Sequence, residues 1–229
     1  MEKQFHQYQN PAVAIDLVVF GYTQKQLSVL LLNRKDAPYK NGWTLPGAFV
    51  QMDETFQDVC LRILNSKLGL SNLFLEQLYS FDRLDRDPRG RVISVSYYSL
   101  INPELFTLTA GTMANDVAWF GVDELPALGF DHSAILSTAI KRLKTKILYD
   151  PVGFELLDEE FTMTELHELY ECILDSSIDR RNFRRKILDS NYIIATGKRR
   201  EGLKNRHPEL YCFNKDLKQN NFHLNITLS

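Results

Sequence analysis

The spacing of hydrophobic and polar positions changes character about two thirds of the way along the chain. Before residue 149, apolar runs of strand length alternate with polar turns and with two stretches of helical spacing. Beyond it, two short helical patterns come first and two short strands follow them. This change predicts two domains, the first spanning residues 1–149 and the second residues 150–229.

The first domain is predicted to mix strands with helices. Apolar runs at 12–22 and 27–34, joined by the polar residues 23–26, are typical of a hairpin of buried strands. Three further runs predict strands, with polar and apolar side chains alternating in the middle one: 75–81, 91–101 and 116–122. Residues 131–148 have helical spacing and predict a helix capped by Asp131 or Ser133.

Residues 46–70 join an extended segment to a helix with one buried face. The apolar positions of that face recur every three or four residues: Phe56, Val59, Cys60, Ile63 and Leu64. Asp53 and Glu54 precede the helix, and Gly69 stands where a helix usually stops.

The second domain has the order helix, tight turn, helix, two-stranded ribbon. Residues 161–174 predict an amphipathic helix with Thr162 as N-cap and Glu165 at the capping-box position. A second helix, capped by Asp179, follows a four-residue turn, and the strands at 191–198 and 209–214 enclose a basic loop. This order is typical of a winged helix-turn-helix.

Composition and charge narrow the class of protein. The 229 residues are 44% hydrophobic and 24% charged, with a net charge of −2, as in ordinary globular proteins. No apolar run approaches the roughly 20 residues of a membrane span, and the first residues lack an apolar signal-peptide core. The three cysteines are far apart and form no Cys-x-x-Cys pair, so we expect reduced thiols in a cytoplasmic protein, with neither a disulfide nor a zinc site.

Positive charge is concentrated in the second domain. Residues 178–218 hold twelve lysines and arginines against five acids, a net +7 in a chain whose total is −2. A basic face on an otherwise acidic protein can be merely solvated, but here the cations fall on the second helix and the wing, the two elements that meet DNA in this fold. The predicted DNA-binding residues are Arg180, Arg181, Asn182, Arg184, Arg185, Lys186, Lys198, Arg199, Arg200, Lys204 and Arg206.

The segment 46–70 resembles the Nudix box, whose frame is glycine, five residues, glutamate, seven residues, then Arg-Glu-apolar-x-Glu-Glu-x-Gly. Glu54, Arg62 and Gly69 fit that frame without gaps, whereas Ala48 replaces its first glycine. Three glutamates of the box converge on one helix face to bind the divalent cations that activate water. Ile63, Ser66 and Lys67 stand at those positions, so we predict no catalytic residues, no metal site, no cofactor and no hydrolase activity.

A second acidic group could supply relocated metal ligands. Asp82, Asp85 and Asp87 lie together, but arginines alternate with them, which predicts a solvated loop that pairs with itself. His132 has no neighbouring cysteine or serine and is interpreted as a capping or pocket residue.

A degenerate Nudix domain followed by a winged helix resembles the Nudix-related transcriptional regulators of bacteria, and within them the arabinose-responsive type. The resemblance covers nearly the whole chain, with matching blocks such as 49–54, 85–101 and 181–187. It implies a homodimer that binds a palindromic operator and releases it when a small effector fills the former Nudix pocket. The effector it implies is a pentose such as L-arabinose, or ADP-ribose as in the sister group.

The fold class expected from these patterns is α+β: a Nudix-like α/β/α sandwich followed by a C-terminal winged helix-turn-helix domain. The lost carboxylates favour a neutral, hydroxyl-rich effector held by side chains alone. The candidate ligand-binding residues are Arg34, Gln51, Glu54, Asp85 and Arg86. Two alternatives stay open, a Nudix hydrolase with relocated metal ligands acting on ADP-ribose or a related diphosphate, and a scaffold that binds only proteins.

Overall fold

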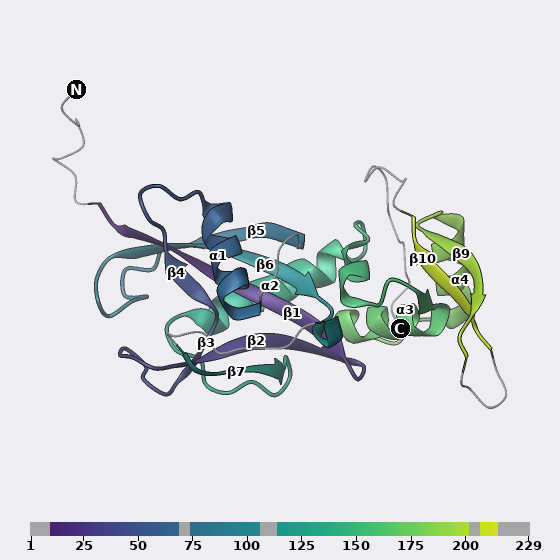
Figure 1. Cartoon of the computed structure of the whole chain (residues 1–229), viewed down its shortest axis with the longest axis horizontal. Helices are drawn as coiled ribbons and strands as arrows, with labels where there is room; N and C mark the ends of the chain where they lie inside the picture. Colours follow the sequence, from purple (N-terminus) through teal and green to yellow (C-terminus); the bar gives the residue numbers. More distant parts are fainter. Residues whose placement is uncertain (1–9, 69–73, 106–113, 202–206, 215–229) are drawn as a thin grey trace, which may run out of the picture.

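The computed structural model describes residues 10–68, 74–105, 114–201 and 207–214, with the side chains of 66–68 left out (Figure 1). The molecule is elongated, with a large sheet at one end of its long axis and a small winged domain at the other. The predicted α+β class, a Nudix-like domain followed by a winged helix, is confirmed.

Seven strands of the described chain form the large sheet. In spatial order β3, β2, β1, β6 and β5 lie side by side, while β4 pairs with β1 and β7 with β2. Strands β1 and β6 are parallel, and the other pairs are antiparallel. The strands are β1 (Ala12–Thr23), β2 (Gln26–Arg34), β3 (Trp43–Thr44), β4 (Gly47–Phe49), β5 (Phe74–Phe81), β6 (Val92–Ile101) and β7 (Ala114–Gly121).

The predicted hairpin at the start of the chain is confirmed. Strands β1 and β2 pair up to Thr23 and Gln26, so Gln24 and Lys25 form a two-residue turn. Both turn residues have positive φ, 51° and 63°. Such a turn matches the right-handed twist of the flanking strands, which is why it is used although neither residue is a glycine.

Two helices cover the sheet on opposite faces, α1 (Phe56–Leu68) in front and α2 (His132–Lys146) behind in Figure 1. Val59 and Cys60 of α1 pack with one set of β1 side chains, and Ile135 and Ala139 of α2 with the other set. The predicted strand at 91–101 is confirmed as β6, and side chains on both of its faces are buried for this reason. Ser94 on its polar side is 0% exposed, because a helix lies over each face.

The winged domain follows the predicted order. A 3₁₀ turn, η2 (Val152–Leu156), leads through β8 (Phe161–Thr162) to the two helices α3 (Met163–Leu174) and α4 (Arg180–Asp189). Strands β9 (Ile193–Arg199) and β10 (Glu209–Phe213) complete a small sheet with β8. The capping box is confirmed, since Glu165 N donates to Thr162 Oγ1 at 3.2 Å and Thr162 N to the Glu165 carboxylate at 2.7 Å.

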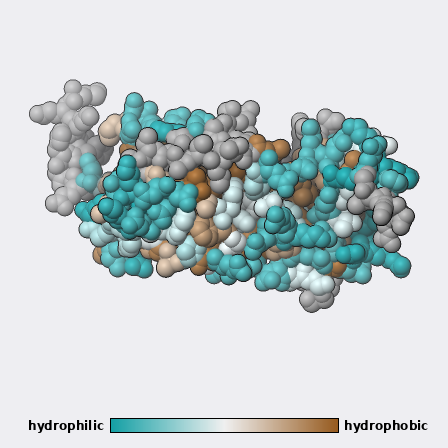
Figure 2. Space-filling view, turned by 60° about the horizontal axis from the view of Figure 1, so that its bottom comes forward, coloured by the Kyte–Doolittle hydropathy of each residue, from teal (hydrophilic) through white to brown (hydrophobic). Residues whose placement is uncertain are grey.

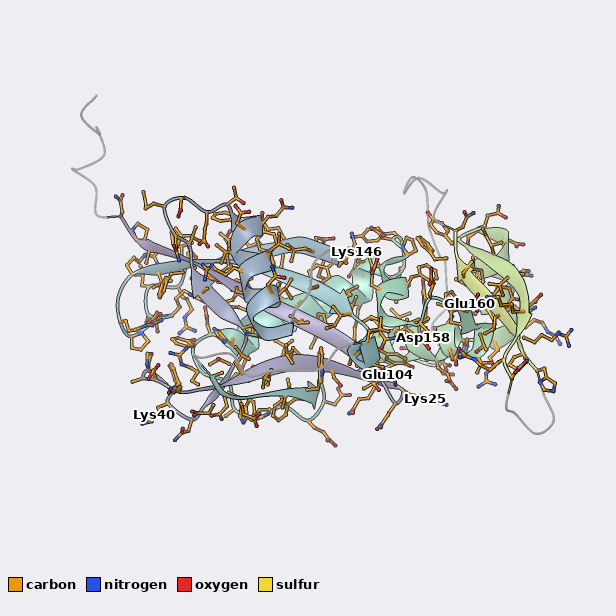
Figure 3. All side chains as sticks on the ribbon, viewed as in Figure 1. Lys25, Lys40, Glu104, Lys146, Asp158 and Glu160 are labelled. Carbon is orange, nitrogen blue, oxygen red and sulfur yellow. The ribbon has the colours of Figure 1, made fainter. Side chains whose placement is uncertain are left out.

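The two parts share one hydrophobic core. Leu143 and Ile147 at the end of α2 belong to the same buried cluster as Leu169 of α3. Lys25 also pairs with Glu168 at 2.7 Å, and Asn102, ahead of the short turn η1 (Pro103–Leu105), donates to Asp158 at 2.8 Å. Figure 3 shows Lys25 and Asp158 near the place where the two parts meet. In the described ranges no helix has the length and apolar character of a membrane span.

Removing the cap of α3 should destabilise the protein measurably. Thr162→Ala leaves an N-terminal amide of α3 without its acceptor and should lower the free energy of unfolding by about 1 kcal/mol. Thr162→Ser keeps the hydroxyl, so the difference between these two variants in urea unfolding isolates the cap. Thr145→Ala, at an exposed position of α2, should change little, and equal losses at both sites would contradict the role of the cap.

Candidate ligand cavity and nucleic-acid interface

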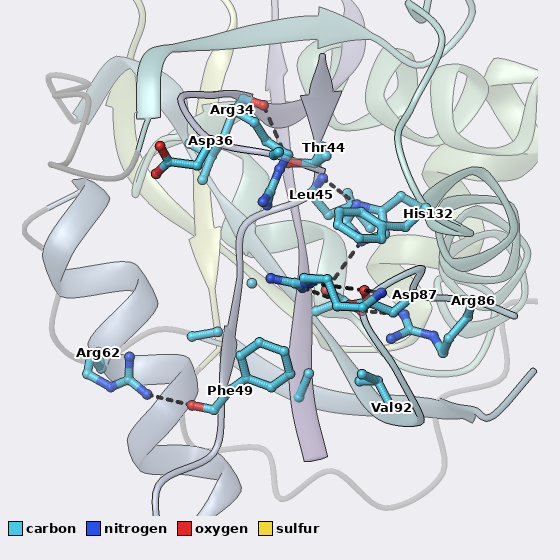
Figure 4. A pocket seen from close by; sticks show the side chains of 18 residues that line it. Arg34, Asp36, Thr44, Leu45, Phe49, Arg62, Arg86, Asp87, Val92 and His132 are labelled. Atoms are coloured by element: carbon cyan, nitrogen blue, oxygen red, sulfur yellow. Dashed lines mark hydrogen bonds and ion pairs between the residues drawn. The ribbon is translucent and has the colours of Figure 1, made fainter. Parts of the chain in front are cut away.

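A cavity of about 410 Å³ opens at the end of the large sheet that lies away from the winged domain (Figure 4). Its walls come from β1, β2, β4, the loop before β6 and the segment before α2. The lining residues are Ala14, Asp16, Leu32, Arg34, Asp36, Ala37, Thr44, Leu45, Gly47, Ala48, Phe49, Arg62, Arg86, Asp87, Arg89, Val92, Phe130 and His132.

Arg86 is the buried centre of the cavity wall. Its side chain is 3% exposed and lies between two carboxylates. The guanidinium donates to Asp16 Oδ2 at 2.8 Å and to both oxygens of Asp131 at 2.8 and 3.0 Å. It therefore ties the loop before β6 to strand β1 and to the start of α2, three segments far apart in the sequence.

Two further side chains, Ser94 and His132, also contact Asp16. Ser94 Oγ donates to Asp16 Oδ2 at 2.7 Å, and His132 Nε2 lies 3.4 Å from Oδ1. Since His132 Nδ1 accepts the amide of Leu45 at 2.9 Å, the ring proton belongs on Nε2, facing Asp16. Burial alone would raise the pKa of Asp16, but His132, Arg86 and Ser94 together hold that pKa below its usual range.

Asp131 occupies the N-cap position of α2, as predicted, but its side chain makes no capping hydrogen bond. Both of its oxygens are engaged by Arg86. The expectation that Asp131 caps through its side chain is therefore wrong, because a buried guanidinium competes for the carboxylate. Gly47 allows β4 to lie close to Asp16 on β1. A Cβ at this position would lie 2.7 Å from Asp16 Oδ1.

Two further guanidinium groups contact one aromatic ring at the cavity. Arg34 and Arg89 lie 5.2 and 5.7 Å from the ring centre of Phe130. Arg89 is neutralised by Asp87 at 2.7 Å, whereas Arg34 donates to the carbonyl of Pro38 and has no carboxylate within ion-pair distance in the described part of the chain. Burial and the charge of Arg89 lower the pKa of Arg34. Arg34 thus presents a positive charge to the cavity.

The structure brings two of the five candidate ligand-binding residues to the cavity, Arg34 and Arg86. The other three do not line it. Glu54 is bound by Arg62 at 2.6 and 2.8 Å, Asp85 pairs with Arg83 in solvent, and Gln51 is exposed.

The prediction of a self-paired, solvated loop is correct for Arg83 and Asp85. It is wrong for Arg86, which is 5% exposed and pairs with Asp16 and Asp131 outside the loop. Asp87 pairs within the loop, with Arg89, but it is buried, at 6% exposed. Sequence reasoning also missed Asp16 and Phe130. A single aspartate inside the apolar run 12–22 was the signal that could have identified Asp16, because a carboxylate between buried strands needs a partner.

The helix of the Nudix box presents an apolar side chain where the first glutamate would stand. Ile63 is 4% exposed and packs with Cys60 and Leu64. Ser66 and Lys67 lie in α1, but their side chains are outside the described residues. Within those residues, no group of three histidine, cysteine, aspartate or glutamate side chains could hold a metal ion.

The predicted DNA-binding helix is α4, and its outward side is basic. Phe183 and Ile187 are buried as predicted, whereas Leu188 is 37% exposed. Four arginines are exposed and form two pairs four residues apart, Arg180 with Arg184 and Arg181 with Arg185. Like charges at this spacing repel on a helix, so an anion along the row would stabilise it.

The remaining predicted DNA-binding residues differ in their exposure and in whether their side chains already have partners. Asn182 accepts from Arg185 at 2.8 Å, and Lys186 is half-buried. On the wing, Lys198 pairs with Glu160 at 2.6 Å and Arg200 with Glu165 at 2.7 Å, while Arg199 is exposed and has no ion pair in the described residues. Lys204 and Arg206 lie outside the described residues. The winged end is mainly hydrophilic in the view of Figure 2.

Breaking the buried charge cluster should be costly. Arg86→Met leaves Asp16 and Asp131 buried without a cation, and should lower the free energy of unfolding by about 3–5 kcal/mol. Arg83→Met, at the exposed pair with Asp85, should change it little. Guanidinium unfolding of both variants provides the comparison, and equal stabilities would mean that the cavity wall does not depend on Arg86.

Two family models match the chain, the NUDIX domain over residues 10–139 and the NrtR DNA-binding winged helix domain over residues 153–213. The ADPR-responsive transcriptional repressor NtrR of Acinetobacter baylyi is 32% identical over 210 residues, which cover 90% of this chain and 83% of the relative. The ADP-ribose pyrophosphatase of Methanocaldococcus jannaschii is 36% identical over 135 residues, or 58% of this chain and 76% of the relative.

Solved structures share the architecture. Shewanella oneidensis NrtR complexed with a 27mer DNA is 32% identical, with a TM-score of 0.77 over 88% of this chain and 93% of that one. The NUDIX domain of the same NrtR complexed with ADP ribose is 28% identical, with a TM-score of 0.55 over 62% of this chain and 94% of that one. The chain belongs to the NrtR-type transcriptional regulators, in which a Nudix domain precedes a DNA-binding winged helix.

Proposed function

We propose that this regulator is a repressor whose Nudix cavity binds ADP-ribose as its effector. A homodimer binds a palindromic operator through α4 and the wing, and the effector releases it. The relatives support the choice of effector, since the Acinetobacter baylyi repressor is ADPR-responsive and the Shewanella oneidensis NUDIX domain was solved with ADP ribose.

The observation that carries the choice of effector is Arg34. A half-buried guanidinium with no carboxylate within ion-pair distance in the described residues, and with Arg89 near the same ring, is stabilised by an anionic ligand such as a diphosphate. Phe49 and Phe130 add aromatic surface for the flat parts of a nucleotide. A neutral pentose would leave Arg34 without a counter-ion and fill little of the 410 Å³ cavity.

The pentose effector expected from the sequence has no support among these relatives. It rested on the resemblance to the arabinose-responsive type and on the missing glutamates. The loss of those glutamates removes a metal site but leaves the arginines of the cavity. We retain L-arabinose as the competing ligand for the experiment.

Catalytic inactivity is also part of the proposal. Ile63 offers no metal ligand, and Glu54 is held by Arg62 on two nitrogens. The hydrolase alternative has a defined substrate to test, because the relative from Methanocaldococcus jannaschii is named an ADP-ribose pyrophosphatase.

Calorimetry should show ADP-ribose binding and no heat with L-arabinose. Arg34→Ala should weaken ADP-ribose binding about tenfold or more, the worth of one hydrogen bond to a charged group. Arg83→Ala, outside the cavity, is the matched control and should bind as the wild type does. Binding of L-arabinose but not of ADP-ribose would restore the pentose effector.

Product analysis of the same mixtures with Mg²⁺ or Mn²⁺ separates a sensor from an enzyme. Hydrolysis of ADP-ribose at about 1 turnover per second, abolished by Glu54→Gln, would favour the hydrolase.

DNA binding should depend unequally on the wing arginines. Arg199→Ala removes a cation that has no ion pair in the described residues, so it should weaken operator and scrambled duplexes alike and reduce the salt slope by about one. Arg200→Ala should have a smaller effect, because Arg200 already pairs with Glu165. The operator for this salt series comes from selection on a random duplex pool. Indifference of both duplexes to both variants would favour the protein-binding scaffold.

A further inference from the structure

We propose that Tyr211 is a positioning residue that fixes Arg184 of α4 for reading a base pair. The inference rests on the proposed DNA-binding function and extends it to a side chain in the wing sheet that does not itself face the DNA. Tyr211 lies on β10 and is 3% exposed, so its ring belongs to the core of the winged domain.

A chain of two hydrogen bonds links the wing to the helix. Arg184 Nη2 donates to Tyr211 Oη at 3.2 Å, and Tyr211 Oη donates to Glu209 Oε2 at 2.6 Å. Glu209 therefore sets the direction of the hydroxyl proton, and the lone pairs of the hydroxyl remain for the arginine. Burial and then the bond to Glu209 raise the pKa of Tyr211, which keeps the hydroxyl protonated.

This contact restricts an otherwise flexible side chain. A free arginine side chain has many rotamers, and this conformational freedom is lost when the side chain binds in a single geometry. The exposed Arg180 and Arg181 make no such contact in the described residues, whereas one nitrogen of Arg184 is anchored and its other donors stay free. An arginine held in this way suits bidentate contact with the acceptors of a guanine.

The hydroxyl has a second effect on the same arginine. Glu209 is a carboxylate at the start of β10, on the side of the wing sheet that holds Arg184 through Tyr211. While the hydroxyl donates to Glu209, Oε2 of that carboxylate is engaged. Without the hydroxyl, Glu209 is left to pair with Arg184 directly and to compete with DNA. Both effects predict that Tyr211→Phe, which removes only the hydroxyl oxygen, causes a loss of base discrimination.

Selection from a random duplex pool with the full-length protein tests the inference. Arg184→Ala should flatten the preference at one base pair of each half-site by roughly tenfold, as expected for one bidentate contact. Tyr211→Phe should flatten the preference at the same base pair, while the salt slope on scrambled DNA stays at the wild-type value. Glu209→Gln keeps an acceptor for the hydroxyl and should retain most of the preference.

Tyr192→Phe is the matched control, since it removes the hydroxyl of another buried tyrosine from the same domain. It should leave every base preference intact, and thermal unfolding verifies that all variants are folded. A Tyr211→Phe pool identical to the wild-type pool would overturn the inference, as would an equal loss of affinity for selected and scrambled DNA. If the wild type selects no sequence at all, the proposed function fails instead.

Discussion

The rest of the first domain depends on a single buried guanidinium. Arg86 joins strand β1 through Asp16 and the first turn of α2 through Asp131, and the loop that carries it forms a wall of the cavity. Buried ion pairs gain little net stability over apolar packing, because the charges lose their hydration. Their geometry is nevertheless restrictive, since every partner must stay within hydrogen-bond distance. The cavity is therefore shaped by a charge cluster more than by its apolar lining.

The same cluster sets the position of the element that reaches the winged domain. Helix α2 begins beside Asp131 and spans fifteen residues, roughly 22 Å at 1.5 Å per residue. Its last turn packs in the core shared with α3, and Lys144 lies 3.7 Å from Asp175 beyond the end of α3. One rigid element thus contacts both the cavity wall and the DNA-binding domain. A displacement at Asp131 has a short physical route to α3 along this helix.

Local patterns predicted the elements that local forces determine. The apolar runs gave β1 and β2, helical spacing gave α1 to α4, and the capping box at Thr162 was readable from two side chains. The short strands β3, β4 and β8 carry no pattern of their own and exist because longer strands pair with them. The site was harder to predict, since Arg86 meets partners 70 and 45 residues away. Charges that alternate along a loop predict self-pairing, and only tertiary structure shows that Arg86 turns inward.

The ion pairs of Lys198 and Arg200 with Glu160 and Glu165 have a consequence for the protein in a cell. A genome offers about 10⁶–10⁹ sites of the wrong sequence, and phosphate contacts bind all of them alike. Two wing cations that already have carboxylate partners bind those decoy sites less strongly than free cations would. Under the proposed function, more of the protein therefore remains available to search for its few true sites.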